Sequence, residues 1–251
     1  MQEKIDIIEV AKSFAKAKNT YKQHAIIQEK MRYKLIEILK NYGQNRFLEV
    51  FEFGVGEGEF SEILQANINY TYYIANDINF IENLTSKNLF DRAEIFDMNT
   101  LHAQHIFKKK FDLIASNACL QWLKLKQTLQ NLSTMLKPNG ILLLSTFGEQ
   151  NLTELAQIAD ISLEYASLKD IWKILKNLCN LEILTLQEER ITLDFDSSFK
   201  VFKHLQKSGT NALKAHQTKL NKTLLSKYQA QFGGRITYHP IYILARKKSI
   251  I

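Results

Sequence analysis

The chain has 251 residues, 45% hydrophobic and 24% charged, with a net charge of +7, which is the composition of a globular protein with a substantial core. Its apolar runs are too short to span a bilayer, and its N-terminus lacks the form of a secretion signal. The two cysteines, Cys119 and Cys179, form neither a disulfide framework nor a metal-ligand pattern, so we expect a reduced, cytoplasmic protein without a structural metal.

The first 150 residues predict one helix and then strands that alternate with helices. Apolar residues recur at helical spacing from His24 to Tyr42, which predicts a core-facing helix that ends at Gly43. A helix at 125–136 leads to a predicted turn at 137–140. The predicted strands are 47–53, 71–77, 93–98, 111–117 and 141–147. Such alternation predicts an α/β sandwich.

After residue 147 the alternation loosens, and no linker-like stretch divides the chain, so we expect one domain. Ser167 with Asp170 three residues later is a capping-box arrangement that predicts the start of a helix. Pro240 predicts a bulge or an edge position in the last strand, because proline cannot donate to the ladder. The remaining predicted segments are helices at 151–159, 167–178, 199–206 and 212–231, and strands at 181–195 and 235–246.

The turn after the first strand carries a glycine at every second position: Gly54, Gly56 and Gly58. Such glycines let the backbone adopt angles closed to other residues and let main-chain N–H groups approach a ligand. A dinucleotide fingerprint would need its third glycine where Glu59 stands, and a Walker loop would need an absent Gly-Lys-Ser/Thr. An acidic residue, Glu52, followed by alternating glycines resembles motif I of the S-adenosylmethionine methyltransferases; a plain structural turn is the alternative.

Polar residues also end the next three predicted strands. Asp77 lies about 20 residues after the glycines, where doubly wound folds place a carboxylate that holds ribose hydroxyls. Asp97 ends the third strand and Asn117 the fourth. Any one of them could be a helix cap or a turn residue. Together they predict a ligand site, because ligands of open α/β sheets bind outside the strand C-termini.

The charge of the chain is unevenly distributed. Residues 200–251 contain eleven Lys or Arg and no Asp or Glu, whereas the other residues contain 22 basic and 26 acidic side chains. This asymmetry predicts an anionic partner, which could be a nucleic acid, an anionic membrane surface or an acidic protein. A solvated face on a lysine-rich protein is the alternative.

Short stretches along almost the whole chain are similar to a single protein family. They are Phe14–Tyr21, His24-Ala25 with Gln28, the Leu120-Gln121-Trp122 triplet, Ser145–Leu155, Ser208–Ala212 and the Tyr-rich last strand. The chain resembles in these places the malonyl-[acyl-carrier-protein] O-methyltransferases of biotin synthesis. It departs from them at Val55, where Cys or Ser is more usual, and at Pro240.

This resemblance implies a Rossmann-like class I methyltransferase with a mostly parallel seven-stranded sheet, helices on both faces, an N-terminal helical cap and a helical insertion after strand five. It implies a single domain with a cap (1–43), a cofactor-binding core (44–147) and substrate-side helices and last strands (148–251). The implied reaction transfers a methyl group from S-adenosylmethionine (SAM) to the free carboxylate of malonyl-acyl-carrier protein, giving the malonyl methyl ester that starts pimeloyl synthesis. Because a carboxylate is already ionised at neutral pH, with a pKa of about 4, we expect no catalytic base.

The resemblance also implies a set of site residues. Gln121, Trp122 and Tyr21 are expected to close the site over the substrate, although Trp122 could instead be a core aromatic. The basic segment 200–248 is expected to dock an acidic acyl carrier protein. The expected cofactor-binding residues are Glu52, Gly54, Gly56, Gly58, Asp77, Ile78, Asp97, Met98 and Asn117.

Two other kinds of substrate stay open. A methyltransferase acting on another small carboxylic acid or on a quinone precursor would share most of these motifs. An RNA methyltransferase would also use the basic segment, but amino-group methylation usually involves an Asn/Asp-Pro-Pro-aromatic loop, and Ser116-Asn117-Ala118 stands in its place. Cys119 has no preceding proline or partner base, so we expect it to pack as a small apolar residue. RNA is therefore the weaker of these alternatives, and we expect no membrane partner.

Overall fold

The computed structural model describes residues 25–79, 89–159, 164–207 and 221–249, in which the chain forms two compact units. The sheet unit comprises residues 28–146, 167–188 and 241–251, and the insertion unit comprises residues 1–27, 147–166 and 189–240. None of the helices in the described ranges combines the length and apolar character needed to cross a membrane.

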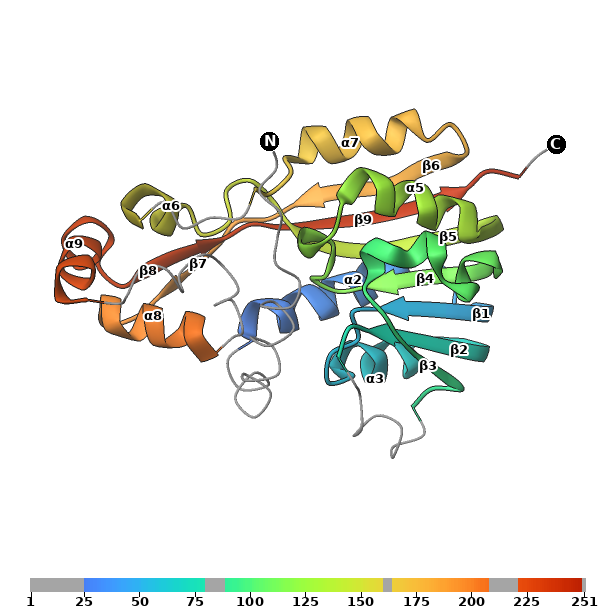
Figure 1. Cartoon of the computed structure of the whole chain (residues 1–251), viewed down its shortest axis with the longest axis horizontal. Helices are drawn as coiled ribbons and strands as arrows, with labels where there is room; N and C mark the ends of the chain where they lie inside the picture. The colour runs from blue at the N-terminus through green and yellow to red at the C-terminus, as the bar shows by residue number, and fades with distance from the viewer. Residues whose placement is uncertain (1–24, 80–88, 160–163, 208–220, 250–251) are drawn as a thin grey trace. The chain divides into compact units, whose positions relative to one another are not determined.

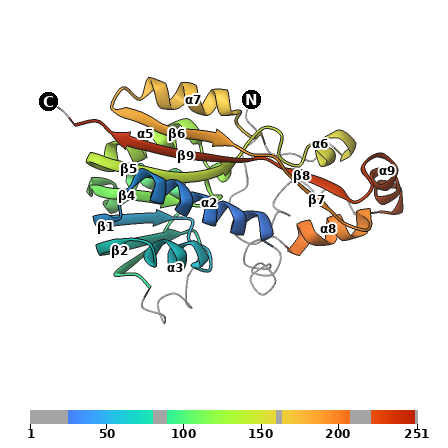
Figure 2. The same ribbon diagram turned by 180° about the vertical axis from the view of Figure 1, so that it is seen from behind.

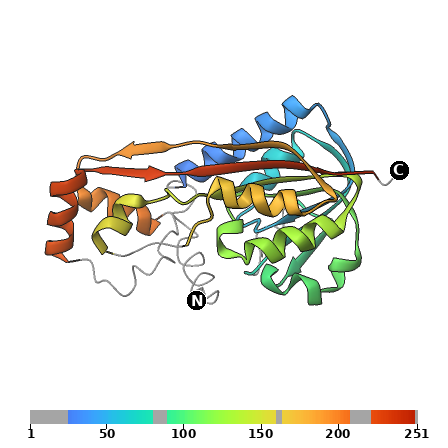
Figure 3. The same ribbon diagram turned by 90° about the horizontal axis from the view of Figure 1, so that it is seen from above.

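The sheet unit is built on a seven-stranded sheet with the order β3-β2-β1-β4-β5-β9-β6 among the described residues. Adjacent strands from β3 to β5 are parallel, whereas β6 and β9 are antiparallel. Figures 1 and 2, viewed from opposite sides, show α5 and α7 in front of the sheet in one view and α2 in front in the other, and Figure 3 shows the same layering from above. The expected mostly parallel α/β sheet with helices on both faces is confirmed.

The strands and helices of this unit largely follow the predicted ranges. They are α2 (Ile26–Tyr42), β1 (Arg46–Phe53), α3 (Glu59–Gln65), β2 (Asn69–Asp77), β3 (Arg92–Ile95), β4 (Phe111–Ser116), α5 (Leu125–Met135), β5 (Leu136–Phe147), α7 (Leu168–Asn177), β6 (Leu181–Glu188) and β9 (Pro240–Lys247), with short 3-10 helices η1 (Met98–Ala103), η2 (His105–Lys108) and η3 (Leu120–Trp122). Gly43 has a φ of 84° just after α2, as a helix C-terminus requires. The Ser167 hydroxyl accepts from the N–H of Asp170 (3.1 Å), which confirms the predicted cap of α7.

The central strands are buried on both faces, and their sequences explain why. Residues Ile141–Leu144 of β5 are fully buried, as a continuous apolar run in a parallel strand should be. The rings of Phe51 in β1 and Phe111 in β4 stack with their centroids 5.3 Å apart. Apolar residues thus fill the middle of these strands, and the polar residues lie near the strand ends.

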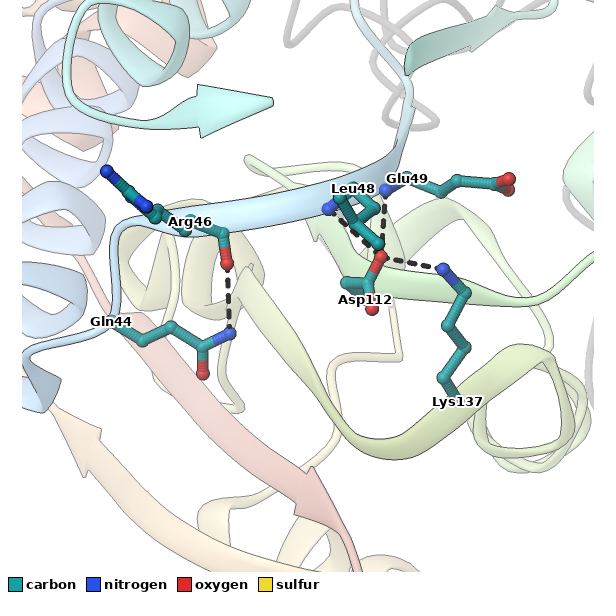
Figure 4. A network of polar contacts seen from close by, with 6 residues as sticks. All are labelled: Gln44, Arg46, Leu48, Glu49, Asp112 and Lys137. Carbon is teal, nitrogen blue, oxygen red and sulfur yellow. Dashed lines mark hydrogen bonds and ion pairs between the residues drawn. The ribbon is translucent and has the colours of Figure 1, made fainter. Parts of the chain in front are cut away.

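A carboxylate ties the N-terminal parts of three strands together (Figure 4). Asp112 Oδ2 accepts hydrogen bonds from the backbone N–H groups of Leu48 (3.1 Å) and Glu49 (2.8 Å) in β1. The same oxygen pairs with Lys137 Nζ of β5 at 2.8 Å. Because β1, β4 and β5 are locked to each other here, the positions of their opposite, C-terminal ends are also set.

The strand β5 begins earlier than predicted. We expected a turn at 137–140 and a strand from Ile141, but the strand already begins at Leu136. Its pairing with β4 shifts register between Phe111 and Leu113, and Asn139 adopts a φ of 64°. Between these pairs β5 advances five residues while β4 advances two, so the residues predicted as a turn bulge out of the ladder, and only the start of the strand differs from the prediction.

The insertion unit contains α6 (Thr153–Ala159), β7 (Ile191–Asp194), α8 (Ser198–Lys207), α9 (Lys222–Phe232) and β8 (Arg235–Tyr238), with β7 and β8 paired antiparallel. The predicted strand 181–195 is divided into β6 and β7, and the predicted strand 235–246 into β8 and β9. In each case the two pieces belong to different sheets. Pro240 is the first residue of β9 and not an interior residue, so two continuous strands were wrongly predicted.

Polar contacts between buried side chains hold the insertion unit together. His204 of α8 lies with a ring nitrogen 2.9 Å from the hydroxyl of Tyr238 in β8. Glu154 of α6 accepts from the backbone N–H (3.1 Å) and the hydroxyl (2.6 Å) of Thr237. These contacts join two helices to the short sheet of this unit.

Candidate functional site

The candidate site is the C-terminal edge of β1, β2, β3 and β4 in the sheet unit. Because these neighbouring strands are parallel, their C-terminal ends lie at one edge. Glu52, Asp77, Asp97 and Asn117 stand at or just after these four strand ends. The structure therefore brings together the predicted polar strand ends.

The glycine loop between β1 and α3 adopts the backbone that its sequence predicts. Gly54, Gly56 and Gly58 have φ angles of 66°, 55° and 83°, in the region that favours glycine. A Cβ on Gly54 would lie 2.6 Å from Cys119 Sγ, whereas a Cβ on Gly56 would meet no atom within 4 Å. Packing thus requires the first glycine, and the exposed second glycine leaves open space where the backbone can approach a ligand.

Asp77 links the glycine loop to the end of β2. Its Oδ2 accepts from the N–H of Gly56 (2.9 Å), and its Oδ1 accepts from the N–H of Asn79 (2.9 Å). Burial raises the pKa of the Asp77 carboxyl, and the N–H groups of Asn79, Gly56 and Ile78 partly offset this rise. A carboxylate has about four lone-pair positions, so Asp77 can still accept from a ligand hydroxyl.

Asp97 both caps a helix and keeps an acceptor available. Its Oδ1 accepts from the N–H (2.9 Å) and the side-chain amide (3.0 Å) of Asn99 at the start of η1. Oδ2 of Asp97 makes no hydrogen bond to the part of the chain that the structure describes. Asn76 donates to the carbonyls of Glu94 and Phe96 (3.1 Å each), which fixes the end of β3 just before Asp97. Met98 is buried beside it.

Glu52 is a buried carboxylate with a partner that the sequence analysis missed. Glu52 is 1% exposed and accepts a hydrogen bond from the Tyr73 hydroxyl of β2. Burial, together with the negative charges of Asp77 and Glu59, raises the pKa of Glu52 to about 7, although hydrogen bonds from Tyr73 and Ser61 oppose the rise. The signal that could have found Tyr73 is the β1/β2 register, which places Tyr73 opposite Val50 and hence on the same face as Glu52.

Asn117 connects the loop after β4 to its neighbours. Its amide nitrogen donates to the carbonyl of Gln28 (3.1 Å), and its amide oxygen accepts from the Ser145 hydroxyl (2.7 Å). Ser145 Oγ also accepts from the N–H of Ala118 (3.0 Å), whose φ is 52°. The Asn117 side chain thus holds the loop in place, and its contact with the cofactor stays a prediction.

The expected substrate residues lie in or beyond this loop. Gln121 donates to the carbonyl of Ala118 (2.6 Å) and accepts from the Thr146 hydroxyl (3.3 Å). Trp122 is 7% exposed, so most of this residue is buried. Tyr21 lies outside the described residues. Contact of these three side chains with the substrate stays a prediction.

Cys119 fits the packing role expected for it. Its sulfur and Cβ lie where a side chain on Gly54 would be, so Cys119 fills the space that the glycine leaves. Burial raises the pKa of the Cys119 thiol, and the charges of Asp77 and Asp97 raise it further. The thiol therefore stays protonated at neutral pH and is not an activated nucleophile.

The edge as a whole is rich in acceptors. Glu52, Asp77 and Asp97 are suited to a ligand that carries hydroxyl and amine donors together with positive charge. The glycine loop adds backbone that a ligand can approach closely. In the described part of the chain, no group of three His, Cys, Asp or Glu side chains could hold a metal ion.

Residues 27–180 match the family model described as a methyltransferase domain. The malonyl-[acyl-carrier protein] O-methyltransferase of Haemophilus influenzae is 34% identical over 256 residues, which cover 98% of this chain and 96% of the relative.

Solved structures share the fold at low sequence identity. The YcgJ protein of Bacillus subtilis is 12% identical, with a TM-score of 0.59 over 87% of this chain and 100% of that chain. Phosphoethanolamine N-methyltransferase 2 of Haemonchus contortus, solved with S-adenosyl-L-methionine, is 14% identical, with a TM-score of 0.51 over 87% of this chain and 53% of that chain. At these identities the likeness concerns the fold alone.

Proposed function

The chain belongs to the methyltransferase-domain family and, within it, to the malonyl-[acyl-carrier protein] O-methyltransferases, and we infer that it methylates the free carboxylate of malonyl-acyl-carrier protein with SAM as the methyl donor. The observation that carries this inference is the 34% identity over 98% of the chain. The product is the malonyl methyl ester that starts pimeloyl and biotin synthesis.

The residues of the sheet edge suit the methyl donor. SAM, when bound, supplies a methyl group on a positively charged sulfur. Glu52 and the glycine loop would hold the methionine part, with Asp77 at the ribose and Asp97 beside Met98 at the adenine. The support for this assignment is chemical, because three carboxylates at one edge match the hydroxyl, amine and cationic groups of this molecule.

The reaction needs no protein base. The malonyl carboxylate is ionised at neutral pH, so one of its oxygens can form the new bond to the methyl carbon while the bond from carbon to sulfur breaks and sulfur keeps the electron pair. An anion and a cation become two neutral groups, and such a reaction is favoured where the reactants are held in line and water is excluded. We assign the covering of the substrate to Tyr21, Gln121 and Trp122.

The basic segment 200–248 is proposed to bind the carrier protein. Lys203 of α8 and Lys227 of α9 are exposed and make no ion pair with the described residues. Phe199, which is 56% exposed on α8, adds an apolar group one helical turn before Lys203. Acyl carrier proteins are acidic, so opposite charges would steer the carrier to this surface.

We also propose that the two units act as one catalytic domain in the cytoplasm. The alignment with the Haemophilus influenzae relative runs across both units. Cys119 and Cys179 are free in the described part of the chain, which agrees with a reducing compartment.

The test of this function is transfer of labelled methyl from SAM to a panel of acceptors. We expect base-labile label on malonyl-acyl-carrier protein and none on acetyl-acyl-carrier protein, which lacks the free carboxylate. Malonyl-CoA, free malonate, trans-aconitate and total RNA complete the panel. Label that appears on trans-aconitate or RNA but not on the malonyl carrier would contradict the proposed substrate.

A further inference from the structure

Glu52 lies in surroundings that favour loss of its charge. It is 1% exposed, at the position where β1 leads into the glycine loop. The ionisable groups that act on it are Tyr73 and Asp77 from β2 and Glu59 from α3, with the Ser61 hydroxyl of α3 also nearby. None of these groups is a cation. Among the residues that the structure describes, no Lys, Arg or His pairs with Glu52, and a buried carboxylate in such surroundings is costly to ionise.

Tyr73 is the strongest partner of this carboxylate. Its side chain is fully buried, and its hydroxyl donates to Glu52 Oε2. The phenol is itself unable to ionise here, because burial and the nearby Glu52 charge raise the pKa of Tyr73 well above its usual value. Tyr73 therefore keeps its proton and donates it in the hydrogen bond to Glu52, and this bond favours the ionised form of Glu52 over the protonated form.

We propose that Tyr73 is a positioning residue that holds Glu52 beside the glycine loop, and that binding of the cationic methyl donor there makes Glu52 release a proton. The proposal rests on the proposed function, since it takes SAM as the ligand of this edge. A nearby positive charge stabilises a carboxylate, so a ligand cation and the Glu52 proton compete. Binding and proton release are linked, and each must depend on the other.

The linkage defines the expected pH dependence. Because the pKa of Glu52 is raised to about 7, the free protein contains both protonated and ionised Glu52 near neutral pH. Binding of SAM near neutral pH should then release a fraction of a proton per protein molecule from this group. Replacing Tyr73 by Phe removes the donor, raises the pKa of Glu52 and increases the proton release at pH 7.

The experiment is titration calorimetry with SAM in two buffers of different ionisation enthalpy, on wild type, Glu52→Gln and Tyr73→Phe. The number of protons released by wild type minus the number released by Glu52→Gln gives the contribution of Glu52, because protons released by SAM itself are common to both proteins. For Tyr73→Phe we expect the dissociation constant to rise about tenfold at pH 6.5 and only about twofold at pH 8.5, where Glu52 is largely ionised in both proteins.

Tyr72→Phe is the matched control, because Tyr72 immediately precedes Tyr73 in β2 and points to the other face of the sheet. It should leave proton release and affinity unchanged. SAM binding with equal proton release in wild type, Glu52→Gln and Tyr73→Phe would overturn the inference and leave the proposed function standing. Absence of SAM binding by the wild-type protein would instead overturn the proposed function and this inference with it.

Discussion

At the scale of single residues, the buried carboxylate of Glu52 makes the stability of the protein depend on pH. The folded protein holds the pKa of Glu52 at about 7, against an ordinary value of 4.5. The folded state therefore binds more protons than the unfolded state between these values. The contribution of Glu52 to stability is fully present below pH 4.5 and is lost as the pH rises through 7.

We predict that Glu52→Gln removes this loss. The unfolding free energy of the variant minus that of wild type should increase by about 2 kcal/mol from pH 5 to pH 8, because glutamine has no charge to bury. Urea unfolding of the ligand-free proteins at both pH values measures this difference. Glu49→Gln, at a half-exposed position of the same strand, is the control; an equal gain in both variants would show that burial of Glu52 is not the cause.

At the scale of elements, the glycine loop is constrained by the loop after β4. We predict that Gly54→Ala destabilises the protein by about 2–4 kcal/mol, since it combines an unfavourable φ with a clash against Cys119. Gly43→Ala has the same backbone penalty without a nearby atom, so it should cost only about 1 kcal/mol. Chemical denaturation of both variants gives the comparison.

A second substitution separates the two causes. Cys119→Gly should recover the steric part of the Gly54→Ala loss, because it removes both the sulfur and the Cβ that a new side chain would meet. The recovery is measured as the interaction energy of a double-mutant cycle. Simple additivity of the two substitutions would contradict the packing role of Cys119.

The order of the elements and most strand ends could be predicted because the alternation of strands and helices determines them. Asp77, Asp97 and Asn117 were placed at one edge for this reason. The partner of Glu52 could not be predicted, since Tyr73 meets it only through the pairing of two strands. The sequence also could not show that residues 181–195 are divided between two sheets. One bent strand and two successive strands have the same alternation of apolar and polar residues. The turn residues near Pro138 are tolerated inside β5 by a bulge.

At the scale of the whole molecule, the separation of charge predicts how the substrate is recognised. We expect Lys203→Glu combined with Lys227→Glu to raise the KM for malonyl-acyl-carrier protein about tenfold or more, because the attraction to an acidic carrier is reversed. The KM for malonyl-CoA, which has no protein carrier, should change less than twofold. Steady-state kinetics at low and physiological salt measures both, and added salt should shrink the difference.

Lys126→Glu, at an exposed position of α5 in the sheet unit, provides the control with the same type of charge change. It should leave both KM values within a factor of two. An equal effect of Lys126→Glu and of the paired substitution would show that net charge, and not the basic segment, attracts the carrier.

The most direct test of the whole account is the affinity for SAM of wild type, Asp77→Asn and Asp112→Asn. Both aspartates belong to the same sheet, but Asp77 lies at the C-terminal end of its strand, in the candidate site. Asp112 lies near the N-terminal end of its strand, where it pairs with Lys137. We predict that Asp77→Asn weakens binding at least tenfold, whereas Asp112→Asn lowers the unfolding free energy by about 1–3 kcal/mol and leaves affinity within a factor of two. Unchanged affinity in Asp77→Asn would contradict the placement of the methyl donor at the C-terminal edge of the sheet.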